Sequence, residues 1–220
     1  MATNQFDREN TVVTKIKRRF AKGLYNSRIL VEIRRDVSVH IAAPEPKIPI
    51  RLRLFQPSDV EALFVGSHGL EDRRELADVA WRMRMIAEGA LTSRCFVAVT
   101  VHTDQPCHIQ WLTTGTYSAA VQRAGWLPTL RSDEALLENA YTARTYRRMG
   151  IMSAVTAQIV EHAASLGVRN VIAFAERDNA ASLKGVEKAG LSPVQLHTLR
   201  EYGFGLVRTQ NIRPVASLDA

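Results

Sequence analysis

A glycine flanked by arginines is the part of this sequence best suited to bind a phosphate group. Residues 141–154 read YTARTYRRMGIMSA and lie between a predicted strand and a strongly periodic predicted helix. A helix that begins at such a turn presents unpaired backbone N–H groups and the positive end of its dipole. Gly150 permits a close approach that a side chain would block, and Arg147 and Arg148 add positive charge. The pattern predicts a phosphate or pyrophosphate site, with a glycine turn and solvated arginines as the alternative.

A carboxylate precedes this turn on the strand predicted over residues 135–142. Glu138 shares a strand face with Glu134, and it can accept a proton from an ammonium group directly or through water. The alternative is a half-exposed strand glutamate that pairs with one of the many arginines. His108 and Trp111, on the preceding strand, are candidates for lining an acceptor site or, alternatively, packed residues.

Hydrophobic periodicity predicts the elements that position these residues. Strands are predicted over residues 50–55, 94–100, 107–113, 135–142, 168–175 and 199–207, and helices over 59–64, 71–88, 151–166 and 180–189. The strands come first in hairpin order and then alternate with helices. This order favours an α/β or α+β domain built around a mixed sheet.

The net positive charge of the chain is confined to its first quarter. Residues 1–53 hold twelve Lys and Arg against five Asp and Glu, whereas residues 54–220 hold seventeen of each. A basic amphipathic helix over 9–27 and a strand over 28–40 are predicted there. This segment can make a weak, salt-sensitive contact with an anionic membrane or a nucleic acid, or fold onto the body as a solvated helix.

Composition sets the domain organisation and excludes several classes of protein. Three prolines within residues 43–49 indicate a linker, so we divide the chain into a basic extension (1–47), a domain (48–208) and a tail (209–220).

With 46% hydrophobic and 23% charged residues the chain is globular, not disordered or collagen-like. We find no apolar run of the roughly 20 residues that a transmembrane helix needs, and the polar start is unlike a secretory signal. Two cysteines, and six histidines without ligand spacing, predict no disulfide, no metal site and a cytoplasmic location.

Two spaced motifs resemble the GNAT superfamily of acyl-CoA-dependent N-acyltransferases. Residues 147–152, RRMGIM, are similar to the family's pyrophosphate loop, and residues 179–191, NAASLKGVEKAGL, are similar to its second signature. The strand at 50–55, followed by Gln-Pro-Ser-Asp, matches the family's opening, so the resemblance covers residues 48–208. It implies a twisted mixed sheet of six or seven strands with about four helices, splayed beside residues 135–142. It also implies direct transfer of an acyl group, usually acetyl, from acetyl-CoA or another acyl-CoA to a primary amine.

The resemblance assigns roles to individual residues. The residues expected to bind the pyrophosphate are Arg147, Arg148, Met149, Gly150, Ile151, Met152 and Ser153. The pantetheine arm is expected along the backbone of Tyr141 and Thr142, although Tyr141 can equally be a core aromatic. Asn179 is expected to contact the same arm, with an ordinary helix cap as the alternative, and Ser182 to assist it or to face solvent.

Three positions depart from the family pattern. Met152 replaces a small residue and crowds the backbone approach, Val186 stands where many members carry a tyrosine that can protonate the leaving thiolate, and Leu191 replaces an aromatic residue. Two alternatives therefore stay open: an inactive binding module of this fold, and an acyltransferase that uses a longer acyl-CoA or an acyl-carrier-protein donor. The sequence identifies neither the acceptor amine nor the oligomeric state, and a homodimer is one of the open states.

Overall fold

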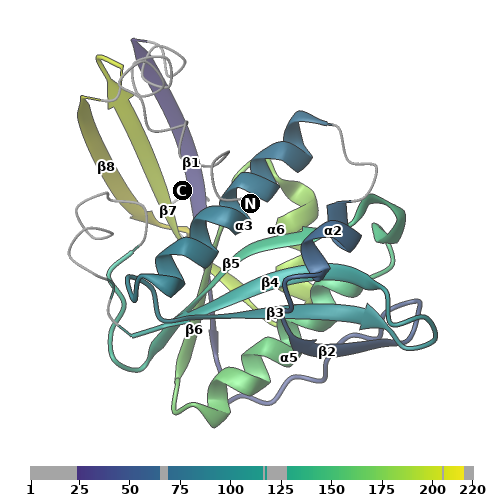
Figure 1. Cartoon of the computed structure of the whole chain (residues 1–220). Coiled ribbons are helices and arrows are strands. Elements are labelled where there is room, and N and C mark those ends of the chain that lie inside the picture. Colours follow the sequence, from purple (N-terminus) through teal and green to yellow (C-terminus); the bar gives the residue numbers. More distant parts are fainter. Residues whose placement is uncertain (1–23, 65–68, 116, 118–127, 205, 216–220) are drawn as a thin grey trace. The chain divides into compact units, whose positions relative to one another are not determined.

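The computed structural model describes residues 24–64, 69–115, 117, 128–204 and 206–215 (Figure 1). The strands are β1 (Tyr25–Asp36), β2 (Ile50–Leu54), β3 (Ser93–Thr100), β4 (Pro106–Thr114), β5 (Glu134–Thr142), β6 (Asn170–Glu176), β7 (Ser192–Tyr202) and β8 (Val207–Pro214). The helices are α2 (Asp59–Phe64), α3 (Leu70–Ala87), α5 (Ile151–Ser165) and α6 (Ala180–Lys188), with a 3-10 turn at Arg144–Tyr146. The strand order is β2-β3-β4-β5-β6-β1-β7-β8. The predicted mixed α/β sheet is therefore confirmed, with eight strands instead of six or seven because β1 and β8 also join it.

The chain divides into two compact units, which are described separately. The larger unit holds residues 33–174 and 179–193, and the smaller unit holds residues 24–32, 175–178 and the described part of 194–215. Strands β1, β6 and β7 contribute residues to both units. Every residue of the predicted site lies in the larger unit. The domain boundary that the sequence predicts at residue 47 stays a prediction.

Helices cover both faces of the sheet in the larger unit, α2 and α3 on one face and α5 on the other (Figure 1). The neighbours β2, β3, β4 and β5 are antiparallel, and β6 runs parallel to β5. Successive side chains of a strand point to opposite faces. In β4, Ile109 and Trp111 therefore pack beneath α2 and α3, whereas Gln110 accepts a hydrogen bond from Thr156 of α5 at 3.1 Å. With both faces covered, β4 is buried over almost its whole length.

The second half of β5 is paired along one edge only. Its pairing with β6 runs from Glu134 to Leu137 and then ends, whereas its pairing with β4 continues as far as Thr142. A bulge lies at the point of separation, where Asn139 has a left-handed φ of 48° and the register with β4 shifts. Residues 138–142 therefore keep one row of backbone groups that no described strand pairs with, as the predicted splay requires.

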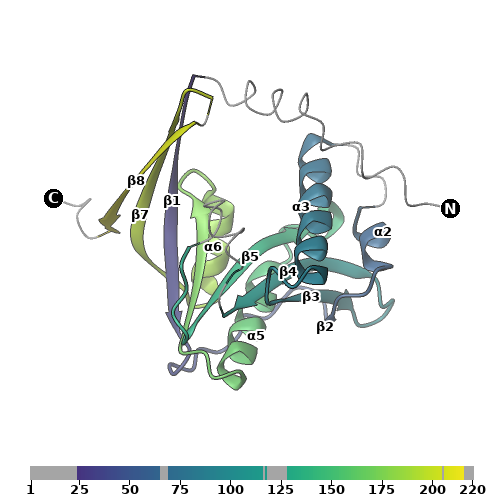
Figure 2. The same cartoon turned by 60° about the vertical axis from the view of Figure 1, so that its left-hand side comes forward.

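Three strands build the smaller unit. β7 and β8 form an antiparallel pair, and the backbone N–H of Gly203 donates to the carbonyl of Leu24 at 2.9 Å, just before β1 begins (Figure 2). A chain of polar side chains, buried at Glu32 and His197 and exposed at Gln210, joins all three strands. Glu32 of β1 lies 2.6 Å from Nε2 of His197 on β7, whose Nδ1 lies 2.8 Å from the side-chain amide of Gln210 on β8. These contacts fix the register of β1 within the unit.

Candidate functional site

The turn that opens α5 presents a row of unpaired backbone amides. Arg148 and Gly150 have left-handed φ values of 65° and 76°, and Gly150 caps the helix without a side-chain hydrogen bond. Within the described part of the chain, the backbone N–H groups of residues 148–153 donate no hydrogen bond. Consecutive N–H groups at such a turn, added to the positive end of a 15-residue helix, form a concave anion site.

The proline-rich segment lies against the outside of this turn, a contact that sequence reasoning did not identify. The Lys47 backbone N–H donates to the carbonyl of Met149 at 2.8 Å. A Cβ atom on Gly150 would lie 3.6 Å from Glu45 and from Pro46, which is an ordinary contact distance. The conformation of the turn, more than lack of space, therefore requires glycine here.

Met152 occupies space that a glycine of α6 leaves free. A Cβ atom on Gly185 would overlap the methyl group of Met152. The larger side chain at 152, which departs from the family pattern, is thus accommodated by the missing side chain at 185. Its bulk packs between α5 and α6.

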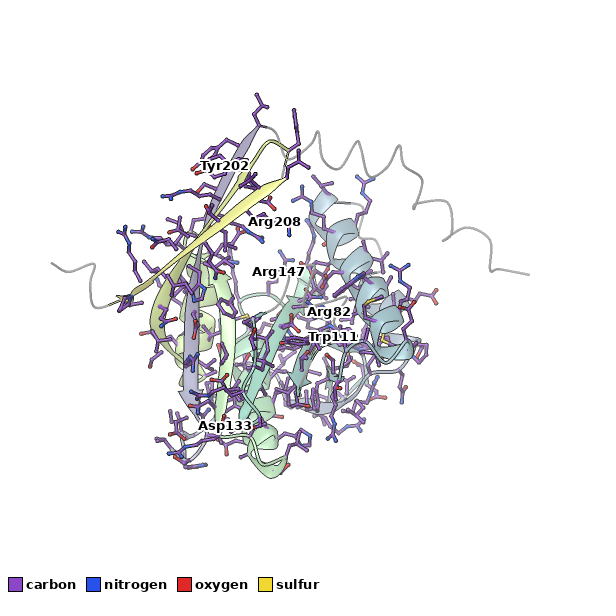
Figure 3. The ribbon with its side chains drawn as sticks, turned by 90° about the vertical axis from the view of Figure 1, so that its left-hand side faces the viewer. Arg82, Trp111, Asp133, Arg147, Tyr202 and Arg208 are labelled. Atoms are coloured by element: carbon purple, nitrogen blue, oxygen red, sulfur yellow. The ribbon has the colours of Figure 1, made fainter. Side chains whose placement is uncertain are left out.

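Arg147 is tied to the end of β5. Its Nε donates to the carbonyl of Thr142 at 3.1 Å, and its guanidinium lies 5.8 Å from the centre of the Tyr141 ring (Figure 3). Thr142 in turn bonds through its hydroxyl to Nδ1 of His108, at 2.8 Å. The predicted phosphate turn and the predicted arm-binding strand are therefore directly connected.

A buried carboxylate of α3, Asp72, contacts the end of β5 and the 3-10 turn that follows it. Asp72 accepts a hydrogen bond from the Tyr141 hydroxyl at 3.1 Å and lies 3.0 Å from the guanidinium of Arg144. Burial alone would raise the pKa of Asp72, but the hydrogen bonds from Arg144 and Tyr141 outweigh it and lower that pKa. The sequence carries no signal for this contact, because Asp72 and its two partners are about seventy residues apart.

Glu138 forms a buried ion pair with Arg82 of α3. The two side chains are 8% and 9% exposed, and Arg82 Nη1 lies 2.9 Å from Glu138 Oε2 (Figure 3). The Thr113 hydroxyl donates to the same oxygen at 2.9 Å. Burial alone would lower the pKa of Arg82, but the attraction of Glu138 and Asp78 raises it. The arginine partner that we weighed as an alternative role for Glu138 is thus present, and both roles use the same carboxylate.

The remaining candidate side chains are packed or bonded locally. His108 is fully buried on the α5 side of the sheet, and burial lowers its pKa to about 4, so it is neutral at neutral pH. Asn179 accepts a hydrogen bond from the backbone N–H of Ser182 at 3.0 Å and so caps α6. The cofactor contacts of Asn179 and Ser182 stay predictions.

The sequence also matches a model of a known protein family. A family model described as the Acetyltransferase (GNAT) family matches residues 75–191, more than half of the chain. The chain belongs to the GNAT family. The match spans most of α3, the splayed β5, the amide-lined turn and the α6 signature.

Solved structures show the same GNAT fold. An acetyltransferase of the GNAT family from Colwellia psychrerythraea matches with a TM-score of 0.53 and 15% identity, over 80% of this chain and 56% of its own. A GCN5-related N-acetyltransferase from Sphaerobacter thermophilus matches with a TM-score of 0.52 and 15% identity, over 88% and 57%. A tandem GNAT protein from the clavulanic acid biosynthesis pathway matches with a TM-score of 0.52 and 13% identity, over 76% and 51%. The chain thus spans about half the length of these structures, and no curated protein sequence matches it.

Both cysteines of this GNAT domain are poorly suited to act as nucleophiles. Cys95 and Cys107 are both buried, and burial raises the pKa of each thiol, that of Cys107 to about 11. Among the described residues, no group of His, Cys, Asp and Glu side chains is arranged to hold a metal ion. In that same part of the chain, no helix has the length and apolar character of a membrane span.

Proposed function

We propose that this GNAT-family chain transfers an acyl group, usually acetyl, from CoA to a primary amine by direct attack in a ternary complex. One observation carries the proposal: the backbone N–H groups of residues 148–153, which donate no hydrogen bond among the described residues, follow within a few positions the part of β5 that β6 does not pair with. An anion site close in sequence to a strand edge that no described strand pairs with matches a ligand with a pyrophosphate and an amide-containing arm.

The residues that would hold acyl-CoA follow from this arrangement. The pyrophosphate would be held by the amides of residues 148–153 and by the charges of Arg147 and Arg148. The pantetheine arm would lie along the backbone of Tyr141 and Thr142, near the amide side chain of Asn179. When bound, the cosubstrate supplies an activated thioester carbonyl that an amine can attack. The raised pKa values of Cys95 and Cys107 favour direct attack over an acyl-enzyme route.

The chain would accelerate the reaction mainly by alignment and secondarily by moving a proton. Holding two reactants in one orientation replaces a bimolecular encounter with an effectively unimolecular step. Glu138 would take the proton of the ammonium group, through water, so that a neutral amine remains. Backbone N–H groups of β5, beyond the point where its pairing with β6 ends, would stabilise negative charge as it develops on an oxygen.

Calorimetry with CoA, followed by a thiol-release screen with acetyl-CoA over several amine classes, tests the proposal. We expect wild-type protein to bind CoA and Gly150→Asp to raise the acyl-CoA KM strongly, because it adds bulk and a repelling charge to the turn. Arg169→Asp, a charge change outside the turn, is the matched control and should leave KM nearly unchanged. Failure to bind CoA would refute the enzyme proposal.

The screen also separates the alternatives. Binding of CoA without thiol release for any amine or acyl chain would favour an inactive binding module. Faster release from longer acyl-CoA or from an acyl-carrier protein would identify a different donor. An unchanged KM in Gly150→Asp would show that the phosphates bind elsewhere.

A further inference from the structure

A side-chain amide stands at the point where β5 separates from β6. Asn139 comes two positions after Leu137, the last residue of β5 that pairs with β6. In the register with the other neighbour, β4 has only Gln110 where β5 has both Asn139 and Ala140. Such a two-against-one arrangement is a β-bulge, a feature that re-aims side chains beside functional sites.

The amide of Asn139 holds a hydrogen-bond donor without an acceptor. Its Nδ2 is buried and has no hydrogen-bond partner among the described residues. Nε2 of His108 and Nε1 of Trp111 share this property, but both of those side chains are fully buried. Asn139 is partly exposed, and the terminal torsion of an asparagine is broad. Its amide can therefore turn to meet a ligand.

The backbone alone does not account for an asparagine at this position. Its left-handed φ of 48° is a conformation that both glycine and asparagine adopt readily. Glycine would serve this conformation equally well and would bury no donor. A donor that is buried without an acceptor costs free energy, and a ligand that accepts its hydrogen bond removes that cost.

The place of Asn139 along β5 indicates which group accepts. Residues 148–153 follow the C-terminal end of β5, so an arm that leaves them along the strand runs toward lower residue numbers. At the usual rise of a strand, Asn139 lies about 10 Å along β5 from Thr142. It is also next in sequence to Glu138, the proposed proton acceptor. An N–H donor at the reacting end suits a carbonyl oxygen, whereas an ammonium group has no lone pair to accept with.

We infer that the side-chain N–H of Asn139 donates a hydrogen bond to the thioester carbonyl oxygen of bound acyl-CoA. This inference rests on the proposed function and adds a side-chain donor to the backbone N–H groups of β5. When the amine nitrogen bonds to the carbonyl carbon, an electron pair moves onto this oxygen. The pair returns as the carbon–sulfur bond breaks and sulfur leaves with the bonding electrons, while Glu138 takes the proton of the amine. Asn139 stabilises the oxygen at the stage when its negative charge is largest.

Calorimetry with two stable analogues of acetyl-CoA tests the contact without turnover. The first keeps the carbonyl and has a methylene group in place of the thioester sulfur, and the second, S-ethyl-CoA, has no carbonyl. We expect the preference for the carbonyl analogue to be about three- to tenfold larger in the wild type than in Asn139→Gly, as one net hydrogen bond would give. The Kd of CoA itself should stay the same, because glycine keeps the left-handed φ and removes only the amide.

A second variant tests whether the amide acts as a donor. Asn139→Asp keeps the shape of the side chain but replaces the donor with a charged acceptor. It should bind the carbonyl analogue more weakly than Asn139→Gly does, because two oxygens would then face each other. Thermal unfolding followed by circular dichroism checks that both variants are folded. If Asn139→Gly does not fold, Asn139→Asp supplies the same comparison with the wild type.

Turnover gives an independent measurement. With an amine found in the thiol-release screen, Asn139→Gly should lower kcat about 100-fold and leave the KM for acetyl-CoA nearly unchanged, because the donor acts mainly in the transition state. Asp104→Gly is the matched control. It makes the same change to glycine at a left-handed φ of 54°, in the turn between β3 and β4, and should alter neither value.

The outcomes separate this inference from the proposed function. Suppose that the wild type binds CoA and releases thiol, but that folded Asn139→Gly and Asn139→Asp keep its preference for the carbonyl analogue. Asn139 then does not contact the carbonyl, and the inference is wrong while the proposed function stands. Tighter binding of the carbonyl analogue by Asn139→Asp would overturn the inference as well. Failure of the wild type to bind CoA would overturn both.

Discussion

Replacing Arg82 with methionine tests how strongly the structure depends on the ion pair that holds Glu138. The change removes the guanidinium 2.9 Å from a carboxylate whose side chain is only 8% exposed. Of the described residues, Thr113 then remains as the hydrogen-bond partner of Glu138. Removing one member of a buried ion pair costs about 3–5 kcal/mol, because the other charge stays buried without its counter-ion.

The second partner of Arg82 contributes much less. Asp78 lies 2.8 Å from the same guanidinium, but its side chain is 37% exposed, and such a pair on a helix surface contributes at most about 0.5 kcal/mol. We therefore expect urea unfolding near neutral pH, followed by tryptophan fluorescence, to show a loss of about 3–4 kcal/mol for Arg82→Met. Asp78→Asn is the matched control and should lose less than about 1 kcal/mol.

The double variant Arg82→Met/Glu138→Gln separates stability from chemistry. A neutral amide in place of the unpaired carboxylate should recover about 2 kcal/mol relative to Arg82→Met alone. Acyl transfer by the double variant should nevertheless stay as slow as in Glu138→Gln, because the proton acceptor is missing. Equal stability of Arg82→Met and the double variant would refute the ion-pair argument. Full activity in a stable double variant would leave Glu138 as a structural carboxylate.

Three other variants test single features of the larger unit. Glu138→Gln should lower kcat/KM about 10- to 100-fold with CoA binding unchanged by calorimetry, and full activity over about pH 6–9 would assign the proton to another acceptor. Burial lowers the pKa of His108 from 6.5 to about 4, so as pH falls the unfolded chain binds a proton at this residue before the folded chain does. The free energy of unfolding of the wild type should therefore fall by up to about 3 kcal/mol between pH 6.5 and pH 4. For the His108→Leu variant, urea unfolding at several pH values should show that this part of the pH dependence is gone. An unchanged dependence of stability on pH would contradict the assignment of this effect to His108. Gly185→Leu places a side chain in the space of the Met152 methyl group and should lower the free energy of unfolding in urea by about 2 kcal/mol. Adding Met152→Gly should restore part of this loss. If the losses of the two single variants add up in the double variant, the contact is excluded.

The element order and the turn at Gly150 could be predicted because their signals are local. The periodic apolar residues of α5 and the glycine before them lie within a few neighbouring positions, and Gly150 indeed has a left-handed φ of 76°. The splay beside β5 came from the family resemblance, and the pairing with β6 ends at Leu137. The conformation at Gly150 thus depends on a short stretch of sequence, whereas the splay involves strands more than thirty positions apart.

The partners of the charged residues could not be predicted, because pairing over long distances leaves no local signal. Glu138 and Arg82 are 56 positions apart, and Arg144 and Asp72 are 72 positions apart. α3 carries several arginines, and burial singles out Arg82 only after the helix has packed on the sheet. The same reason applies to β1, whose place between β6 and β7 depends on strand pairing far along the chain.

In the proposed reaction, the residues around β5 determine which proton transfer the chain can assist. Val186 is buried and has no proton to donate to a leaving group. The Tyr141 hydroxyl donates to Asp72 at 3.1 Å, so its proton is already committed to that carboxylate. A thiolate with a pKa near 8.5 can leave at little cost around neutral pH, whereas an ammonium group near pKa 10 must first lose a proton. The chain therefore contributes most by aligning the reactants and by accepting the proton of the amine, so kcat/KM should rise with pH.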